Sequence, residues 1–125
     1  MTNFYLALDG DNIGSRIELH VLQENIEGLR AFTESFNSVT NAIINRLREN
    51  PDINILLFGG DSLLLAMPAG QIEAVIELIT EVTTGTTFTF SGGYGPTMRH
   101  AYLALKIAKA SGKNRICPLT SEIPA

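Results

Sequence analysis

Apolar and polar residues follow two different rhythms along the chain, which together predict a mixture of strands and helices. Short apolar or β-rich runs are typical of buried strands, and they occupy residues 4–8, 53–58, 63–67 and 87–94. Apolar residues spaced three or four positions apart are typical of amphipathic helices, and they extend over residues 25–48, 68–82 and 97–111. Residues 13–23 fit neither pattern clearly, and we expect an irregular segment there, before the first helix.

Glycine, proline and small polar residues set the boundaries of these elements. Asn50-Pro51 ends the first helix, since proline disfavours helical geometry in the residue before it. Thr97 is the expected N-cap of the last helix, and Gly112 follows its end. Residues 115–118 could add a short final strand. Phe88 and Met98 are expected in the core.

The order of elements predicts an α+β fold of the ferredoxin-like class. Strand, helix, two strands, helix and strand form the split βαββαβ arrangement, here with an extra C-terminal helix. Its usual strand order, 4-1-3-2, places the first strand beside and antiparallel to the third. The end of residues 4–8 therefore lies next to the hairpin at Gly59-Gly60-Asp61-Ser62. This arrangement brings Asp9 and Asp61 together, although 52 positions separate them.

Length and composition limit the class of protein. A chain of 125 residues is expected to form one domain, and 45% apolar with 18% charged residues excludes intrinsic disorder. The single cysteine, Cys117, excludes an internal disulfide and a multi-cysteine zinc site. No apolar run is long enough to cross a bilayer, and no basic region precedes an apolar stretch as in a signal peptide. We expect a cytoplasmic domain over residues 1–125.

Charge is distributed unevenly. Residues 1–96 hold 4 basic and 12 acidic side chains, whereas residues 97–125 hold 5 basic side chains and only Glu122. An acidic protein gains little from counterion release, so we expect no direct binding to nucleic acid. A local basic helix can still bind a small polyanion such as a nucleoside triphosphate, although a solvated helix face would look the same.

The predicted junction of Asp9 with Asp61 indicates a metal site. Two close carboxylates repel each other unless a cation lies between them, and carboxylate with backbone oxygen suits Mg²⁺ or Mn²⁺. The Gly10 carbonyl is placed as a further ligand, and Gly59 and Gly60 leave room for a triphosphate. Each motif alone is more often an ordinary turn or hairpin; their predicted juxtaposition is what favours a two-metal site.

The last predicted helix supplies basic groups. A small-residue face allows it to lie close on a sheet, and consists of Ala101, Ala104, Leu105 and Ala108. Lys106, Lys109 and Lys113 project from the same helix, and the last two share a face at a spacing of four residues. Like charges at that spacing disfavour an isolated helix. A triphosphate bound between Lys109 and Lys113 would offset their repulsion.

Three motifs in this order resemble a known family. Leu8-Asp9-Gly10-Asp11-Asn12-Ile13-Gly14, followed by Phe58-Gly59-Gly60-Asp61, is similar to the palm domain of nucleotidyl cyclases and certain polymerases. The segments 101–109 and 112–115 resemble the last helix of GGDEF diguanylate cyclases. The short length and the Asp-Gly-Asp-Asn form most resemble the minimal CRISPR polymerase (mCpol) family, which is related to the palm that makes cyclic oligoadenylates.

The resemblance implies roles for individual residues. Asp9 and Asp61 match the two metal ligands and catalytic carboxylates, and Gly10 contributes its carbonyl. Lys109 and Lys113 match the residues that bind the triphosphate. The remaining nucleotide-binding positions are Gly59 and Gly60, which make room for nucleotide, and Asp11, Asn12, Ile13 and Gly14. Asp11 and Asn12 could instead support the site from behind, or contact metal, ribose or base.

The chain departs from the pattern at two places. Ser62 stands where related palms have a second acidic residue; either this weakens the site, or only the first acidic position binds metal, which is the interpretation we favour. The guanine-reading residues of GGDEF enzymes are not recognisable, so adenine is the expected base.

Three functions remain open from the sequence. The first is an enzyme that condenses nucleoside triphosphates, ATP favoured, into a cyclic di- or oligonucleotide. Such an enzyme would act as a homodimer with facing sites, and by resemblance its product would serve anti-phage defence through an effector, often a membrane protein. The second is a palm that binds and senses nucleotide without turnover, which Ser62 alone supports. The third, a dimerisation domain, leaves the carboxylates and lysines unexplained.

Overall fold

The computed structural model describes residues 3–124. Its elements in chain order are β1 (Asn3–Gly10), α1 (Ile13–Leu22), α2 (Ile26–Arg48), β2 (Asn54–Gly59), β3 (Ser62–Pro68), a 3₁₀ turn (Ala69–Gln71), α3 (Ile72–Thr83), β4 (Phe90–Gly95), α4 (Met98–Ala110) and β5 (Ile116–Pro118). Within the described residues, none of these helices has the length and apolar character needed to span a membrane.

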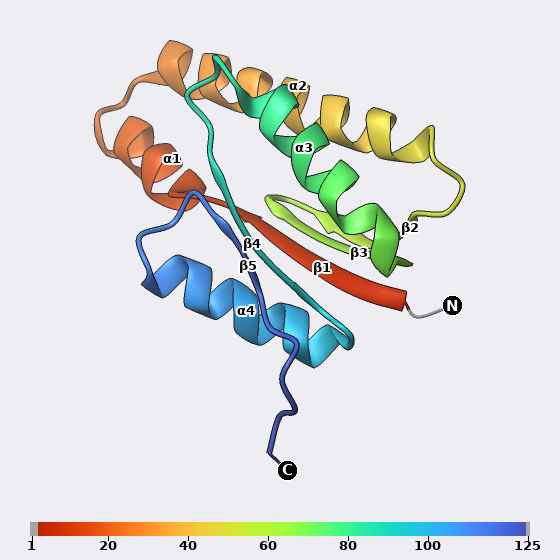
Figure 1. The fold of residues 1–125 in the computed structure, drawn as a ribbon. Helices are drawn as coiled ribbons and strands as arrows, with labels where there is room; N and C mark the ends of the chain where they lie inside the picture. Colours follow the sequence, from red (N-terminus) through yellow and green to blue (C-terminus); the bar gives the residue numbers. More distant parts are fainter. Residues whose placement is uncertain (1–2, 125) are drawn as a thin grey trace.

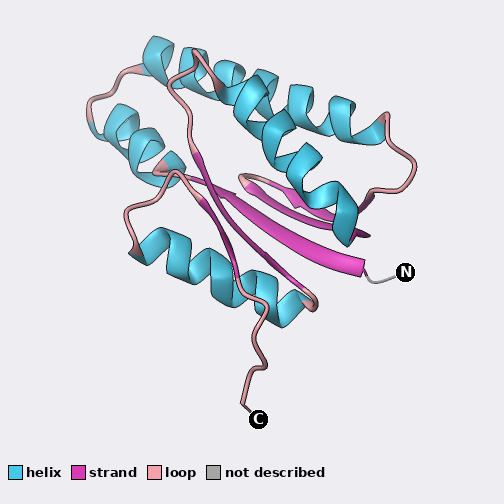
Figure 2. Cartoon of the chain, in the orientation of Figure 1, coloured by secondary structure: helices cyan, strands magenta, loops and turns pink. Residues whose placement is uncertain are grey.

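A five-stranded mixed sheet forms the centre of the molecule, with helices on both faces (Figures 1 and 2). The strand order is β2-β3-β1-β4-β5. β1 pairs antiparallel with both β3 and β4, and β5 runs parallel to β4 at one edge. The α+β class and the predicted 4-1-3-2 order are confirmed, and the optional final strand is present.

The two faces of the sheet bury different side chains. Under α2 and α3, large aliphatic and aromatic residues form the main core, among them Leu6, Leu65, Phe36 and Val75. Under α4, the cluster is small and includes Ala7, Ala101 and Leu105. The predicted small-residue face of the last helix is confirmed: Ala101, Ala104 and Ala108 are each fully buried.

Gly93 of β4 explains how α4 comes so close to the sheet. A Cβ at this position would lie 2.2 Å from the Leu105 nitrogen and 2.4 Å from the Ala104 carbonyl carbon. Both are backbone atoms, so no side-chain movement could make room. Glycine at 93 therefore sets the depth at which α4 packs.

Three expectations are corrected by the structure. Residues 13–22 form a regular helix, α1, whose exposed Leu19 and Leu22 blur the amphipathic pattern. β4 begins at Phe90 rather than residue 87, because Phe90 pairs with Gly10, the last residue of β1, and no strand lies beyond it to pair. Met98 is 54% exposed, whereas Phe88 is buried as expected.

Candidate active site

The end of β1 and the start of β3 place Asp9 directly opposite Ser62. The Ser62 hydroxyl donates a hydrogen bond of 2.6 Å to Asp9 Oδ1. Opposite residues of antiparallel strands project to the same face, so this short bond follows from the register. Ser62 thus orients the carboxylate of Asp9 and leaves Oδ2 available.

Asp61 lies one position further along, opposite Gly10. The Gly10 amide donates to the Asp61 carbonyl oxygen at 2.9 Å. A Cβ on Gly10 would lie 3.3 Å from the Asp61 Cβ and 2.7 Å from Ile13. The Asp61 side chain therefore leaves the sheet on the face of α1 and α2, whereas Asp9, like Ala7, leaves it on the face of α4.

The two carboxylates consequently border different hollows. Asp61 lines a cavity of about 360 Å³ with Phe36 and Asn37 of α2 and residues of α1. Asp9 lines one of about 340 Å³ with Met98 and Tyr102 of α4. The sequence predicted that these aspartates are neighbours in the sheet, which the register confirms, but alternation along the strand separates their faces.

Asp11 is buried, with an exposed fraction of 4%. Its Oδ1 accepts from Ser91 Oγ at 2.6 Å and from Lys109 Nζ at 2.9 Å. Its Oδ2 accepts from Thr89 Oγ1 at 2.7 Å and from the Asn114 amide at 3.0 Å. Burial raises the pKa of Asp11, and these hydrogen bonds together lower the pKa by more, so that it falls below the ordinary value.

These contacts favour one of the roles left open for Asp11, in which it supports the site from behind. Its four partners come from β4 and the residue before it, from α4 and from the loop before β5, all far from β1 in the sequence. No sequence motif marks Thr89 or Ser91, and the motif at residues 112–115 includes Asn114 without assigning it a role. Only the tertiary structure identifies these three residues as partners of Asp11.

Both predicted lysines reach the loop between β1 and α1. Lys109 Nζ donates to the Gly10 carbonyl at 3.2 Å as well as to Asp11. Lys113 Nζ donates to Asn12 Oδ1 at 2.6 Å. Lys113 and Asn114 have left-handed backbone geometry, with φ of 65° and 49°, which turns the chain from α4 back toward the loop. The structure thus places both amines at the candidate site.

The other predicted positions surround this loop. Asn12 has φ of 60° and precedes α1, Ile13 is buried, and Gly14 faces open space. A Cβ on Gly59 or Gly60 at the hairpin would also meet nothing within 4 Å. The surroundings of Gly59 and Gly60 are therefore open, and their role in making room for a nucleotide stays a prediction.

The donor set fits a divalent metal in its chemistry. Among residues 3–124, no three Asp, Glu, His or Cys side chains form a ready metal cluster. Asp9, Asp61 and the Gly10 carbonyl offer oxygen ligands that Mg²⁺ accepts along with water and phosphate oxygens. The Gly10 carbonyl already binds a cation, the ammonium of Lys109, which shows that this oxygen attracts positive charge.

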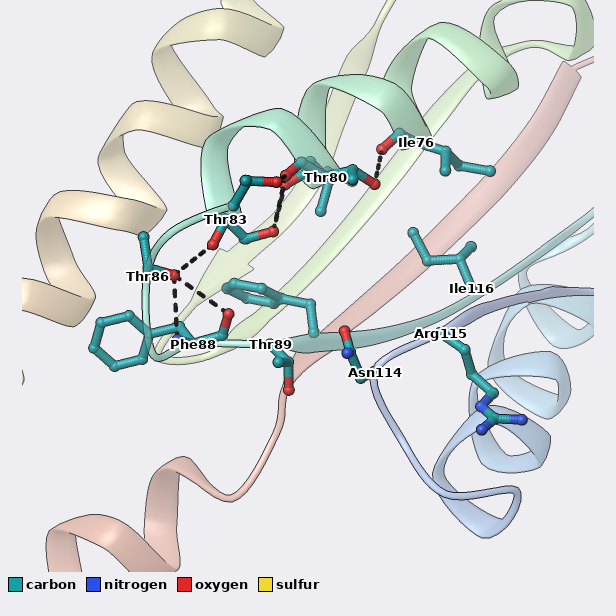
Figure 3. A pocket seen from close by; sticks show the side chains of 12 residues that line it. Ile76, Thr80, Thr83, Thr86, Phe88, Thr89, Asn114, Arg115 and Ile116 are labelled. Carbon is teal, nitrogen blue, oxygen red and sulfur yellow. Dashed lines mark hydrogen bonds between the residues drawn. The ribbon is translucent and has the colours of Figure 1, made fainter.

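A separate hollow of about 360 Å³ lies between the end of α3 and the starts of β4 and β5 (Figure 3). Threonine hydroxyls around it donate to nearby backbone carbonyls, as Thr83 does to Ile79 and Thr86 to Thr83. Thr89 and Asn114 line this hollow and also bind Asp11. Thr89 and Asn114 therefore separate this hollow from Asp11 and contact both.

A family model for the minimal CRISPR polymerase domain matches residues 5–119, nearly the whole chain. The chain belongs to the mCpol family. This confirms the resemblance drawn from the three motifs. No curated protein matches the chain.

Solved structures show the same fold. The chain is similar to the GGDEF domain of DgcB from Caulobacter crescentus in complex with c-di-GMP, with TM-score 0.70 and 21% identity, covering 94% of this chain and 78% of that one. It is also similar to the GGDEF domain of PA1120 (YfiN or TpbB) from Pseudomonas aeruginosa, with TM-score 0.69, 13% identity and coverage of 98% and 84%. A third is diguanylate cyclase SiaD from Pseudomonas aeruginosa in complex with its activator SiaC, with TM-score 0.66 and 19% identity. The match covers 94% of this chain but half of SiaD.

At these identities the likeness shows the fold, which is the palm shared with GGDEF domains. The match to the minimal CRISPR polymerase domain and the palm fold shared with GGDEF domains thus agree with each other.

Proposed function

We propose that this mCpol protein condenses nucleoside triphosphates, ATP favoured, into a cyclic di- or oligonucleotide. The observation that carries the proposal is the convergence of Lys109 and Lys113 on the end of β1 and the loop that follows it. A dimerisation domain has no use for two amines gathered at the loop that follows the strand carrying Asp9. A triphosphate and its metal require both amines and carboxylates.

Each residue has a defined task in this reaction. Lys109 and Lys113 bind the triphosphate oxygens, and Gly59 and Gly60 leave space for it. Asp9 and Asp61, which leave the end of the sheet on opposite faces, would each offer a carboxylate to Mg²⁺ or Mn²⁺ at that end, with the Gly10 carbonyl as a further ligand. When bound, the metal supplies activation of the attacking hydroxyl and neutralises charge on the phosphates.

The reaction joins two nucleotides and releases pyrophosphate. A ribose hydroxyl oxygen of one nucleotide attacks the α-phosphorus of another and gives up its proton to water. The bond from that phosphorus to the pyrophosphate breaks, and pyrophosphate leaves with its electron pair. Lys109 and Lys113 stabilise the charge that develops on the leaving group.

Ring closure calls for two sites. One palm binds one triphosphate, so the second nucleotide comes from a second copy, and we infer a homodimer with facing sites. By analogy with the family, the cyclic product would act in anti-phage defence through an effector, often a membrane protein.

The test is to incubate the protein with each nucleoside triphosphate and Mg²⁺ or Mn²⁺ and to resolve products by mass spectrometry. Asp9→Ala and Asp61→Ala are expected to lose at least 100-fold of the turnover, with circular dichroism spectra like the wild type. Asp52→Ala, which changes an exposed aspartate in the loop before β2, is the matched control. Full activity in both site variants would refute the assignment.

The alternative function, a nucleotide sensor, predicts a different result. Its supporting observation is Ser62, which orients Asp9 but supplies no second carboxylate. Metal-dependent binding of a nucleotide without any product, under the same conditions, would favour the sensor over the enzyme.

A further inference from the structure

The Lys109 side chain donates hydrogen bonds to two oxygen atoms of the candidate site. Its ammonium donates to the Gly10 carbonyl at 3.2 Å and to Asp11 Oδ1 at 2.9 Å. The Lys109 side chain is 27% exposed, whereas that of Asp11 is 1% exposed. The amine is thus reachable from solvent although its anchor is not.

Asp11 does not depend on Lys109 to stay in place. Ser91, Thr89 and the Asn114 amide donate three further hydrogen bonds to its carboxylate. A buried carboxylate that loses every partner strongly destabilises the fold. Asp11 would keep three hydrogen-bond donors without Lys109, so the loss of Lys109 should not have that effect. Lys109 can therefore leave Asp11 without disrupting the framework around it.

The same ammonium occupies the carbonyl to which the proposed metal would bind. A divalent ion and an ammonium cannot share the Gly10 oxygen at close range, because the repulsion between a doubly charged and a singly charged cation at contact distance is large in a partly buried site. Either the metal stays weakly bound or the lysine moves. A triphosphate offers Lys109 an alternative anionic partner.

We propose that Lys109 is an internal counter-ion of the loop between β1 and α1, which competes with the divalent metal until a triphosphate draws it away. This inference rests on the proposed function and concerns the regulation of that same site. Its consequence is coupling: metal binds weakly to the free protein and firmly once nucleotide is present. The protein is thereby kept from binding metal in a form that cannot react.

The coupling is tested by the affinity of the free protein for Mn²⁺, measured by electron paramagnetic resonance without any nucleotide. Lys109→Gln removes the charge and keeps an amide that can donate to Asp11. It is expected to bind Mn²⁺ about tenfold more tightly than the wild type, which corresponds to about 1.4 kcal/mol. Lys109→Met provides a second variant with the same expected direction, and thermal melts verify that both fold.

Two matched lysines control for general electrostatics. Lys106→Gln makes the same charge change on the same helix, but Lys106 lies over the Tyr102 ring, 5.1 Å from its centroid. Lys113→Gln makes it beside the loop, where Lys113 binds the Asn12 side chain rather than the carbonyl. We expect no change in Mn²⁺ affinity for Lys106→Gln and less than threefold for Lys113→Gln.

Equal Mn²⁺ affinities for the wild type and Lys109→Gln would overturn the inference, as would an equal gain in all three lysine variants. The product assay on the wild type separates this result from the proposed function. Product with equal affinities would refute only the competition, whereas tighter Mn²⁺ binding without product would refute only the turnover.

Discussion

The two faces of the sheet are held by opposite means. Under α2 and α3, bulky residues such as Leu65 and Phe36 fill the space between helix and sheet. Under α4, alanines lie against glycines, and the helix backbone comes almost into contact with β4 at Gly93. The face under α2 and α3 is therefore stabilised by bulky side chains that fill the space, and the face under α4 by close packing of the helix backbone on the sheet.

The difference follows from what each helix has to position. Lys109 of α4 must reach the Gly10 carbonyl, and Lys113 in the turn after α4 must reach Asn12, so the distance of α4 from β1 is constrained. Helices α2 and α3 cover the main core. Of these two helices, only α2 lines the cavity beside Asp61. Adding side-chain volume should therefore destabilise the face under α4, whereas removing volume should destabilise the face under α2 and α3.

The largest effect is expected from adding volume under α4. Gly93→Val places carbon atoms against the backbone of Leu105 and Ala104, and overpacking that cannot relax costs about 3 kcal/mol or more. Urea denaturation measures the loss. Gly70→Ala, at a position where a Cβ meets nothing within 4 Å, should stay within about 0.5 kcal/mol of the wild type; a comparable loss there would show that closeness at Gly93 is not the cause.

Removing volume should damage the other face. Leu65 is fully buried, and Leu65→Ala is expected to reduce the free energy of unfolding by about 3 kcal/mol through lost burial and a cavity. Leu57→Ala, on the neighbouring strand and 55% exposed, should cost much less in the same urea titration. Similar losses for both leucines would contradict the assignment of this face as the volume-dependent one.

A smaller effect is expected where a polar contact ties α4 to the loop. Asp11→Asn should lower the free energy of unfolding by about 2 kcal/mol at pH 7, because the amide accepts fewer hydrogen bonds and loses the charge that faces Lys109. The pKa of Asp11 is lowered in the folded protein, so its stabilisation is present above the unfolded pKa and is lost as the pH falls through the folded one.

The pH dependence of that effect distinguishes it from a packing defect. The difference in stability between wild type and Asp11→Asn should shrink below about pH 4, where unfolded aspartate begins to bind protons. Asp52→Asn serves as an exposed control. A difference that stays constant from pH 7 to pH 3 would show that the charge of Asp11 contributes nothing to holding α4.

Periodicity and turn residues predicted most of the fold, with two instructive exceptions. Helix α1 was missed because Leu19, Val21 and Leu22 are exposed, so its sequence shows no clean apolar face. What holds it is tertiary: Arg16 donates to the Thr87 carbonyl at 3.0 Å and lies over the rings of Phe32 and Phe88. Met98 was expected in the core, but at the start of α4 it is 54% exposed.

The sequence by itself determined the order of the elements and the residue types of the site, because turn chemistry and apolar spacing are local. It also predicted that Asp9 and Asp61 are neighbours, since the strand order follows from the βαββαβ pattern. Only the tertiary structure decided on which face each carboxylate leaves the sheet, and that Asp11 is a buried anchor for Lys109. Those facts depend on strand alternation and on contacts about 100 residues apart, which no local pattern encodes.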